Sequence, residues 1–495
     1  MKNLSDIKIA LICDEFTYEC FSPEFDAIVI EPSNWRQKFE QEKPEIFFCE
    51  SAWSGVCSKT RPWKGIIYAS KNFAKENRNV LLDILKYCRE KRIPTVFWNK
   101  EDPTHYTDRT HDFVKTAILF DYIFTSAIEC VETYKRDYLR SNVFCLPFAT
   151  QPRLFNPEEV KSRTNDVIFA GSWYANHIER SNDMLDIFSS IRKTHDLVIY
   201  DRYSQDDDPL HKFPAPYNEM TRPAVPFKDI AKIYKASTVS LTINTVKNSK
   251  TMFARRIYEL MSCNTLVISN SNDGITSQFG HLAIDIEANP NALTQIVQND
   301  VDSMRDAALH EVLAKHTYKE RFKFILDSIG FQYASDEKDL TLVALVNNEA
   351  EIEQFIAYHK SLQMNNSILL LVFGYGFEDI ELAPLFTKYN RGSINTIALS
   401  YLDKYAPFDK KVIETEFIAI LDNDDLLPPN QFKKAYLHTE YMKEIPLLLD
   451  QGNKYTRQDS FTVRNIIAPR QFFNTALLMK GQNINALGYS VNFQG

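Results

Sequence analysis

The sequence contains no long hydrophobic run. Its N-terminal stretch, Met1–Phe16, includes one apolar segment, Ile9–Cys13, which is too short for the apolar region of a signal peptide. No other run approaches the roughly 18 apolar residues of a membrane span. We therefore expect no integral membrane segment and a cytoplasmic location, with peripheral attachment at the inner face of a membrane left open.

Cysteine pairs and an excess of positive charge are missing as well. The 8 cysteines all lie in the first 263 residues and none forms a C-x-x-C pair, so a structural zinc site is not expected. Without a secretion signal, we interpret them as reduced and mostly buried thiols. The net charge of -8 argues against a nucleic-acid partner.

A chain of 495 residues is too long for one hydrophobic core, and its apolar strands alternate with helical patterns. This alternation is typical of parallel sheets in doubly wound domains. Pro147, Pro152 and Pro157 mark a linker, after which the alternation restarts. We therefore predict an α/β fold with one such domain over residues 1–150 and a second over 151–332. The expected strands are Ile7–Cys13, Ala27–Ile30, Ile46–Cys49, Thr95–Trp98, Phe120–Thr125 and Val143–Pro147, then Asp166–Ala170, Leu197–Asp201, Val239–Asn244 and Thr265–Ser269, with helices over Asn79–Lys91 and His316–Ile329.

The loop after the strand Thr95–Trp98 carries two candidate catalytic side chains. In open parallel sheets, ligands bind beyond the carboxyl ends of the strands. Asp102 and His105 lie in this loop, and either could act as a base or as a ligand. The alternative is that each is a loop side chain whose hydrogen bonds are satisfied locally.

The stretch Ser249–Met261 combines a capping residue, cations and an acid. Ser249 can cap a helix, and a helix N-terminus with Lys250 beside it can bind an anion. Arg255 and Glu259 lie four residues apart, on one face of that helix. They form either a surface ion pair, contributing roughly a few tenths of a kcal/mol, or a site for a nucleotide. In the second case Lys250 or Arg255 holds a diphosphate, and Glu259 accepts hydrogen bonds from ribose hydroxyls.

Several segments of this part resemble the CgeB-type spore-protein glycosyltransferases. The matching segments, in the expected order, are Val96–His105, Asp166–Tyr174, Asp201-Arg202 and Thr251–Asn270. The resemblance covers Ile7–Ile329 and implies two Rossmann-like domains in the GT-B arrangement. It also implies a nucleotide-sugar donor held mainly by the second domain, with Glu259 as the ribose-binding acid and with Gly171 and Ser172 in the donor site. Asn264 replaces the usual glycine of one motif, and GT-B enzymes as a class need no metal for catalysis.

A second pattern occupies residues 333–495. Phe417–Leu421 is a continuous apolar run typical of a strand buried on both faces, and it ends in the acidic stretch Asp422–Asp425. Crowded carboxylates need compensation, and Asp422 and Asp424 could share one Mg2+ or Mn2+. The alternative is a capped turn that leads into a helix near Pro428.

This last third resembles the GT-A fold of glycosyltransferase family 2. The pattern includes expected strands at Asp339–Val346, Ser367–Phe373 and Thr396–Leu399 and a helix at Ala350–Leu362. The resemblance implies that Asn347 and Glu349, in the turn after the first strand, contact the nucleotide. It also implies that Asp422 and Asp424 form the DxD pair, holding a metal that bridges the donor diphosphate.

Two features depart from the family 2 pattern. Gly374-Tyr375-Gly376 stands where the second strand usually ends in acidic residues. Ala486–Gly495 resembles the segment that leads into a Trp-Glu-Asp pattern carrying the catalytic base, and the sequence stops before that pattern. We therefore expect this domain, as given, to turn over a donor poorly.

Together the patterns predict a bacterial-type glycosyltransferase of hexosyltransferase type that uses UDP-linked donors. The expected acceptor is a cell-surface or capsular polysaccharide or another envelope component, faced by His105 or Asp102. Two modules could build an alternating polymer. Two alternatives stay open: a non-catalytic envelope- or spore-associated binding protein with decayed sites, and a teichoic-acid-type sugar-phosphate or glycerol-phosphate polymerase with cytidine-linked donors.

Overall fold

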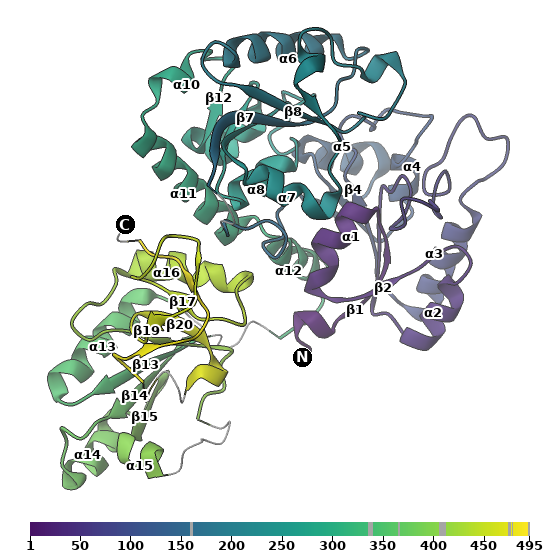
Figure 1. Ribbon diagram of the computed structural model, residues 1–495. Helices are drawn as coiled ribbons and strands as arrows, with labels where there is room; N and C mark the ends of the chain where they lie inside the picture. The colour runs from purple at the N-terminus through teal and green to yellow at the C-terminus, as the bar shows by residue number, and fades with distance from the viewer. Residues whose placement is uncertain are drawn as a thin grey trace. The chain divides into compact units, whose positions relative to one another are not determined.

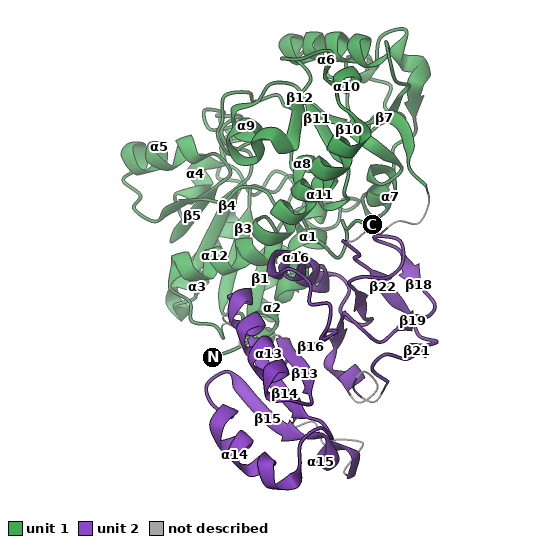
Figure 2. Ribbon diagram, turned by 90° about the vertical axis from the view of Figure 1, so that its left-hand side faces the viewer, with its two compact units in different colours: residues 1–157, 161–334 green, residues 158–160, 335–495 purple. Residues whose placement is uncertain are grey.

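The computed structural model describes residues 1–158, 162–334, 340–364, 367–404, 412–473, 477 and 479–493. The chain forms two compact units (Figure 2). Unit 1 comprises residues 1–334 apart from 158–160, and unit 2 comprises residues 158–160 and 335–495. None of the described helices combines the length and the apolar character needed to cross a membrane.

The first half of unit 1 is a six-stranded sheet, with the strands in the order β2-β1-β3-β4-β5-β6 and every neighbouring pair parallel. It occupies the purple-to-blue part of the chain in Figure 1. Every residue of β3 and β4 is buried, as expected for strands covered by helices on both faces. The strands are β1 (Lys8–Ile12), β2 (Asp26–Val29), β3 (Ile46–Glu50), β4 (Thr95–Asn99), β5 (Tyr122–Thr125) and β6 (Val143–Cys145). The helices are α1 (Glu15–Phe21), α2 (Trp35–Glu42), α3 (Asn79–Lys91), α4 (Val114–Ala117) and α5 (Ile128–Tyr138).

The second half of unit 1 repeats this plan, with six parallel strands in the order β12-β11-β10-β7-β8-β9. Its strands are β7 (Thr164–Gly171), β8 (Leu197–Asp201), β9 (Thr221–Arg222), β10 (Ser237–Thr242), β11 (Leu266–Ser269) and β12 (Ala283–Asp285). Its helices are α6 (Ile178–Ile191), α7 (Ile230–Tyr234), α8 (Arg256–Ser262), α9 (Asp273–Phe279), α10 (Ala292–Gln295), α11 (Gln298–Lys315) and α12 (Tyr318–Ile329).

The last helix of unit 1, α12, packs against the first sheet. Phe322 lies 5.0 Å from Phe25 and 6.0 Å from Phe21, measured between ring centroids. Arg321 donates hydrogen bonds to the carbonyl oxygens of Pro147 and Phe148. This helix therefore ties the second half of unit 1 to the first and fixes the two sheets relative to each other.

The predicted α/β class is confirmed, with two Rossmann-like parallel sheets followed by a further, mixed sheet. The helix predicted over Asn79–Lys91 has these bounds, and the strand predicted over Leu197–Asp201 has its bounds too. The helix predicted from Ser249 is wrong, because α8 begins only at Arg256. Ser249 instead caps a short turn, accepting the N–H of Met252 at 3.0 Å.

Unit 2 is built on an eight-stranded sheet in the order β15-β14-β13-β16-β20-β17-β22-β18. The four neighbouring strands β15, β14, β13 and β16 are parallel, and β20 runs antiparallel to β16. The buried strand predicted over Phe417–Leu421 is present as β16 (Phe417–Ile420) at the centre of this sheet. Of the C-terminal stretch Ala486–Gly495, residues 494 and 495 lie outside the described residues.

The remaining elements of unit 2 follow in chain order. The strands are β13 (Leu340–Val346), β14 (Ser367–Phe373), β15 (Ile394–Ala398), β17 (Leu447–Leu448), β18 (Arg457–Gln458), β19 (Phe461–Thr462), β20 (Ile466–Pro469), β21 (Asn483–Ile484) and β22 (Gly488–Ser490). The helices are α13 (Glu349–Leu362), α14 (Asp379–Tyr389), α15 (Leu399–Lys404) and α16 (Pro429–Leu437). Strands β19 and β21 pair only with each other among the described residues.

Candidate active site

Unit 1 contains a cleft of about 900 Å3 between its two sheets. It lies where strands of both sheets reach their carboxyl ends: Asp14 follows β1, Glu101 follows β4 and Arg202 follows β8. Ligands of parallel α/β sheets bind at such strand ends. The cleft is therefore the candidate active site.

The wall of the cleft that comes from the second sheet is rich in arginine. Arg180 of α6 is 9% exposed and donates a hydrogen bond from Nη2 to the carbonyl oxygen of Ser172 at 3.0 Å. Its Nη1 is buried and has no hydrogen-bond partner. Burial and the nearby Arg256 lower the pKa of Arg180 to about 10, against an opposing effect of Tyr174. The arginines lining this wall are Arg180, Arg202, Arg255 and Arg256.

Arg255 is held rigidly at the entrance to α8. Its guanidinium lies 3.8 Å above the ring centroid of Phe16, which follows β1 in the first sheet. Its Nε is 3.3 Å from Glu259 Oε1, while its Nη1 is buried without a hydrogen-bond partner. Arg180 and Arg255 thus each present an unpaired guanidinium nitrogen, which is an arrangement that favours an anion.

The predicted donor residues Gly171 and Ser172 also line the cleft. A side chain at Gly171 would overlap the ring of Phe169, so only glycine fits at the end of β7. The carbonyl oxygen of Ser172 accepts the hydrogen bond from Arg180 Nη2. These two residues therefore shape the basic wall through their backbone.

Two other predicted donor residues lie elsewhere. Lys250 is exposed and does not line the cleft. Glu259 is 2% exposed, accepts a hydrogen bond from Tyr234 and pairs with Arg255. Glu259 therefore holds the guanidinium of Arg255 in place and does not line the cleft in which a ribose would bind.

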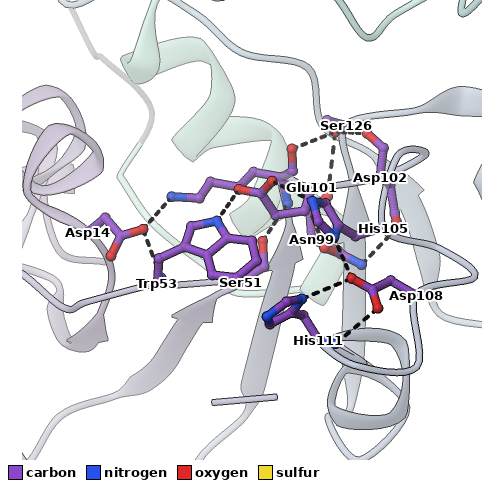
Figure 3. A network of polar contacts seen from close by, with 11 residues as sticks. Asp14, Ser51, Trp53, Asn99, Glu101, Asp102, His105, Asp108, His111 and Ser126 are labelled. Atoms are coloured by element: carbon purple, nitrogen blue, oxygen red, sulfur yellow. Dashed lines mark hydrogen bonds and ion pairs between the residues drawn. The ribbon is translucent and has the colours of Figure 1, made fainter. Parts of the chain in front are cut away.

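The wall that comes from the first sheet centres on a buried lysine. Lys100 Nζ lies 2.9 Å from Asp14 Oδ2 and 2.8 Å from Glu50 Oε1, and its side chain is 3% exposed. Burial and Asp14 raise the pKa of Glu50, which Lys100 opposes. Asp14 also accepts the N–H groups of Trp53, Ser54 and Gly55. Figure 3 shows its contact with Trp53. The lysine therefore fixes the loop that follows β3.

Glu101 is a carboxylate of this wall that keeps one oxygen available. Its Oε1 accepts a hydrogen bond from Trp53 Nε1 at 2.9 Å. Its Oε2 is 3.9 Å from His105 Nε2, beyond hydrogen-bond distance. Sequence reasoning selected its neighbour Asp102 instead.

Asp102 lies away from the cleft and is fully buried. It accepts hydrogen bonds from Asn99 Nδ2 at 2.8 Å (Figure 3) and from Thr125 Oγ1 at 2.7 Å. The carboxylate therefore ties the loop after β4 to the end of β5, which is the locally satisfied alternative. His105 is partly exposed, lies behind Glu101, and pairs with Asp108.

The buried Asp102 is expected to make unit 1 less stable as the pH rises. Burial raises its pKa from 3.8 to about 7, despite the hydrogen bond from Thr125. Because the folded state binds the proton more tightly than the unfolded state, the stabilisation is complete below about pH 4 and is lost as the pH rises towards about 7. A rise in pKa from 3.8 to about 7 corresponds to about 4 kcal/mol.

An Asp102→Asn variant should therefore show a much flatter pH dependence of stability than the wild type. Denaturant unfolding followed by tryptophan fluorescence measures it for unit 1 alone, because all 5 tryptophans lie there. The matched control is Asp83→Asn, a substitution at an exposed residue of α3, which should keep the wild-type pH dependence of stability. Equal pH profiles for Asp102→Asn and wild type would contradict the assignment.

Residues 179–327 match a family model described as glycosyl transferase-like. The match begins in α6, ends in α12 and includes the four arginines of the basic wall. No curated protein matches the chain.

Solved structures of several glycosyltransferases are similar to parts of this chain at low identity. A glycosyltransferase from Rickettsia africae ESF-5 is 12% identical, over 60% of this chain and 92% of that one, with a TM-score of 0.38. WaaG, a glycosyltransferase involved in lipopolysaccharide biosynthesis, is 9% identical over 65% and 99%, with a TM-score of 0.40. An alpha-glucosyltransferase in complex with UDP-glucose and DNA is 10% identical over 62% and 86%, with a TM-score of 0.43.

In unit 2, the predicted nucleotide contacts lie in the turn after β13. Asn347 is exposed, and its backbone N–H donates a hydrogen bond to the side chain of Glu351. Glu349 forms an exposed ion pair with Lys388 at 2.9 Å. A side chain at Gly374 would overlap that of Asn347. The glycines that replace the usual acidic strand end therefore make room for this turn.

The two predicted metal ligands of unit 2 lie beside a partly buried lysine. Asp422 is half-buried and Asp424 is exposed, and the N–H of Asp424 lies 3.3 Å from Asp422 Oδ1. Lys480 Nζ donates to Asn423 Oδ1 at 2.9 Å, and burial lowers its pKa against the opposing effect of Asp422. Sequence reasoning missed this cation, which compensates the acidic strand end.

Proposed function

We propose that this chain is a glycosyltransferase whose unit 1 binds a nucleotide-sugar donor, UDP-linked, in the cleft between its two sheets. The observation that carries the proposal is the pair of unpaired, buried guanidinium nitrogens, on Arg180 and Arg255. The family match to residues 179–327 supports it, because that segment supplies the same basic wall.

The electrostatics of the basic wall suit a diphosphate. Burial removes solvation from the charged form of Arg180, and the nearby positive charge of Arg256 repels it, so both lower the pKa of Arg180. Among the described residues, no ion pair joins Arg180, Arg202 or Arg256 to a carboxylate. A diphosphate would supply the missing negative charge, and hydrogen bonds to charged groups contribute roughly 1.5–3 kcal/mol each.

The two walls divide the chemistry between them. As the bond between sugar and phosphate breaks, negative charge develops on the leaving diphosphate, and the fixed guanidinium groups stabilise it. On the other wall, Glu101 Oε2 can accept the proton of an attacking hydroxyl group. In this proposal Glu101 replaces Asp102 as general base, and His105 acts behind it as a positioning residue.

Unit 2 is proposed as a second, GT-A-like module, which would make the chain bifunctional. Asp422 and Asp424 supply two carboxylates. Mg2+ usually takes one or two carboxylates from a protein and completes its coordination with substrate phosphates and water, so these residues fit Mg2+ or Mn2+. When bound there, the ion would neutralise charge on the leaving diphosphate. Lys480 adds a cation beside Asp422, and Asn347 and Glu349 would contact the nucleotide. The proposed acceptor is a cell-surface or capsular polysaccharide or another envelope component, which receives a hexose.

An Arg180→Met variant should bind UDP and UDP-sugars at least about tenfold more weakly than the wild type, because it loses a charged hydrogen bond. Isothermal titration calorimetry of the full chain measures the change. Arg192→Met, an exposed change at the end of α6, is the control and should bind like the wild type.

The alternatives give different titrations. If the wild type binds no nucleotide, the donor cleft is refuted and the non-catalytic binding protein is favoured. That alternative has one specific observation behind it, since Glu259 is engaged with Arg255 and Tyr234. If CDP binds and UDP does not, the polymerase with cytidine-linked donors is favoured.

A further inference from the structure

Two histidines and an aspartate converge in the loop between β4 and α4. The ligand atoms of His105, Asp108 and His111 all lie within 4.8 Å of one another. The Nδ1 atoms of both histidines are 3.0 Å from the same oxygen, Oδ2 of Asp108 (Figure 3). Among the described residues this is the only such group of three or more.

The three side chains are held in place before any ligand arrives. Asp108 Oδ1 accepts the N–H groups of Thr110 at 2.7 Å and of His111 at 3.2 Å, which leaves Oδ2 to face the histidines. Trp53 packs edge-to-face on both imidazole rings, with centroid distances of 5.4 and 5.2 Å. The side chains are 26%, 25% and 36% exposed for His105, Asp108 and His111, so an ion can reach them from solvent.

We propose that His105 Nδ1, His111 Nδ1 and a carboxylate oxygen of Asp108 form a binding site for a zinc-type transition-metal ion. Bonds of about 2.0–2.1 Å in tetrahedral geometry place neighbouring ligand atoms about 3.3 Å apart. The two separations between Asp108 Oδ2 and the histidine Nδ1 atoms, 3.0 Å each, are close to this value, and all the ligand atoms lie within 4.8 Å of one another. Imidazole with one carboxylate suits Zn2+, Co2+ or Ni2+ and is poor for Mg2+ or Ca2+. Sequence reasoning considered zinc through cysteine spacing alone and did not weigh these histidines.

An outer carboxylate supports the assignment. Histidines that bind a metal usually direct their other ring nitrogen at a carboxylate or carbonyl group. With Nδ1 on the ion, His105 Nε2–H would face Glu101 Oε2, which at 3.9 Å is a neighbour beyond direct hydrogen-bond distance. The ion would therefore fix the loop that carries Glu101, but the site stands without the proposed function, because its ligands are outside the cleft.

The test is metal binding by the full chain, stripped with a chelator and then titrated with ZnCl2 alone. We expect one Zn2+ per chain in the wild type. Loss of an outer partner already weakens a metal about 10- to 100-fold, so loss of a ligand in His111→Asn should weaken Zn2+ more than about 100-fold. Asparagine keeps a donor for Asp108, and His281→Asn, an exposed histidine elsewhere in unit 1, is the matched control.

A second readout needs no ligand variant. Co2+ in this site would lie next to Trp53 and quench its fluorescence, so the quench should be present in the wild type and absent in Trp53→Phe. Zn2+ added in excess should reverse it, whereas Mg2+ should not. A wild type that binds no Zn2+ and shows no Co2+ quench would overturn the proposal, leaving a metal-free hydrogen-bonded cluster, and so would His111→Asn binding Zn2+ as tightly as the control.

Discussion

A Glu101→Gln variant is expected to release UDP from its sugar donor about 10²- to 10⁴-fold more slowly than the wild type, which is the usual contribution of a general base. Glutamine keeps the acceptor oxygen for Trp53 Nε1, so the loop after β4 should stay in place. Donor affinity should change little, because the arginines that would hold the diphosphate come from the second sheet, whereas Glu101 follows β4 of the first. Steady-state kinetics with water or a glycan acceptor would show a fall in kcat with a nearly constant KM.

The comparison variant is Glu15→Gln, which removes the exposed carboxylate at the start of α1 on the same wall. We expect it to stay close to wild-type activity, since Glu101 projects from the end of β4. The opposite pattern, with Glu15→Gln inactive and Glu101→Gln active, would move the base to Glu15.

A Lys100→Met variant is expected to destabilise unit 1 by about 3–5 kcal/mol, the range found when one partner of a buried ion pair is removed. Asp14 and Glu50 would remain buried next to each other without a cation. One of them must then take up a proton, so the loss should be smaller at low pH, where a carboxyl with a raised pKa is neutral. The midpoint of denaturant unfolding, followed by tryptophan fluorescence, measures the effect.

A double variant separates charge from packing. Lys100→Met with Glu50→Gln removes the cation and one buried acid together, and the introduced glutamine can still bond Thr17 and the Asp14 N–H. It should recover part of the lost stability. If the double variant is less stable than Lys100→Met, the lysine acts through packing and the charge account is wrong.

The sequence was most informative where burial sets a periodic pattern. Apolar runs such as Phe417–Leu421 predict a central strand, because a strand covered on both faces has no polar side. The start of α8 could not be predicted in this way. Thr251 Oγ1 donates to the Ser126 carbonyl oxygen and accepts the N–H of Ile128, the first residue of α5, so this stretch is held by contacts distant in the sequence.

The candidate site was only partly predictable for a related reason. Gly171, Ser172 and Arg255, which were predicted from recognisable local stretches, line the cleft. Arg180 in α6 meets the others only through the tertiary fold, and nothing near it in the sequence marks it. Glu101 and Asp102 differ only in the side of the loop they occupy, and this depends on Thr125 of β5, a distant residue in the chain.

The central claim, that donor chemistry belongs to the cleft of unit 1, is tested most directly by UDP release from a panel of UDP-sugars by the full chain. We compare the wild type with Arg180→Met and with Asp422→Ala, which removes a predicted metal ligand of unit 2. The account predicts release by the wild type, little release by Arg180→Met, and retained release by Asp422→Ala. Release that persists in Arg180→Met and disappears in Asp422→Ala would contradict it.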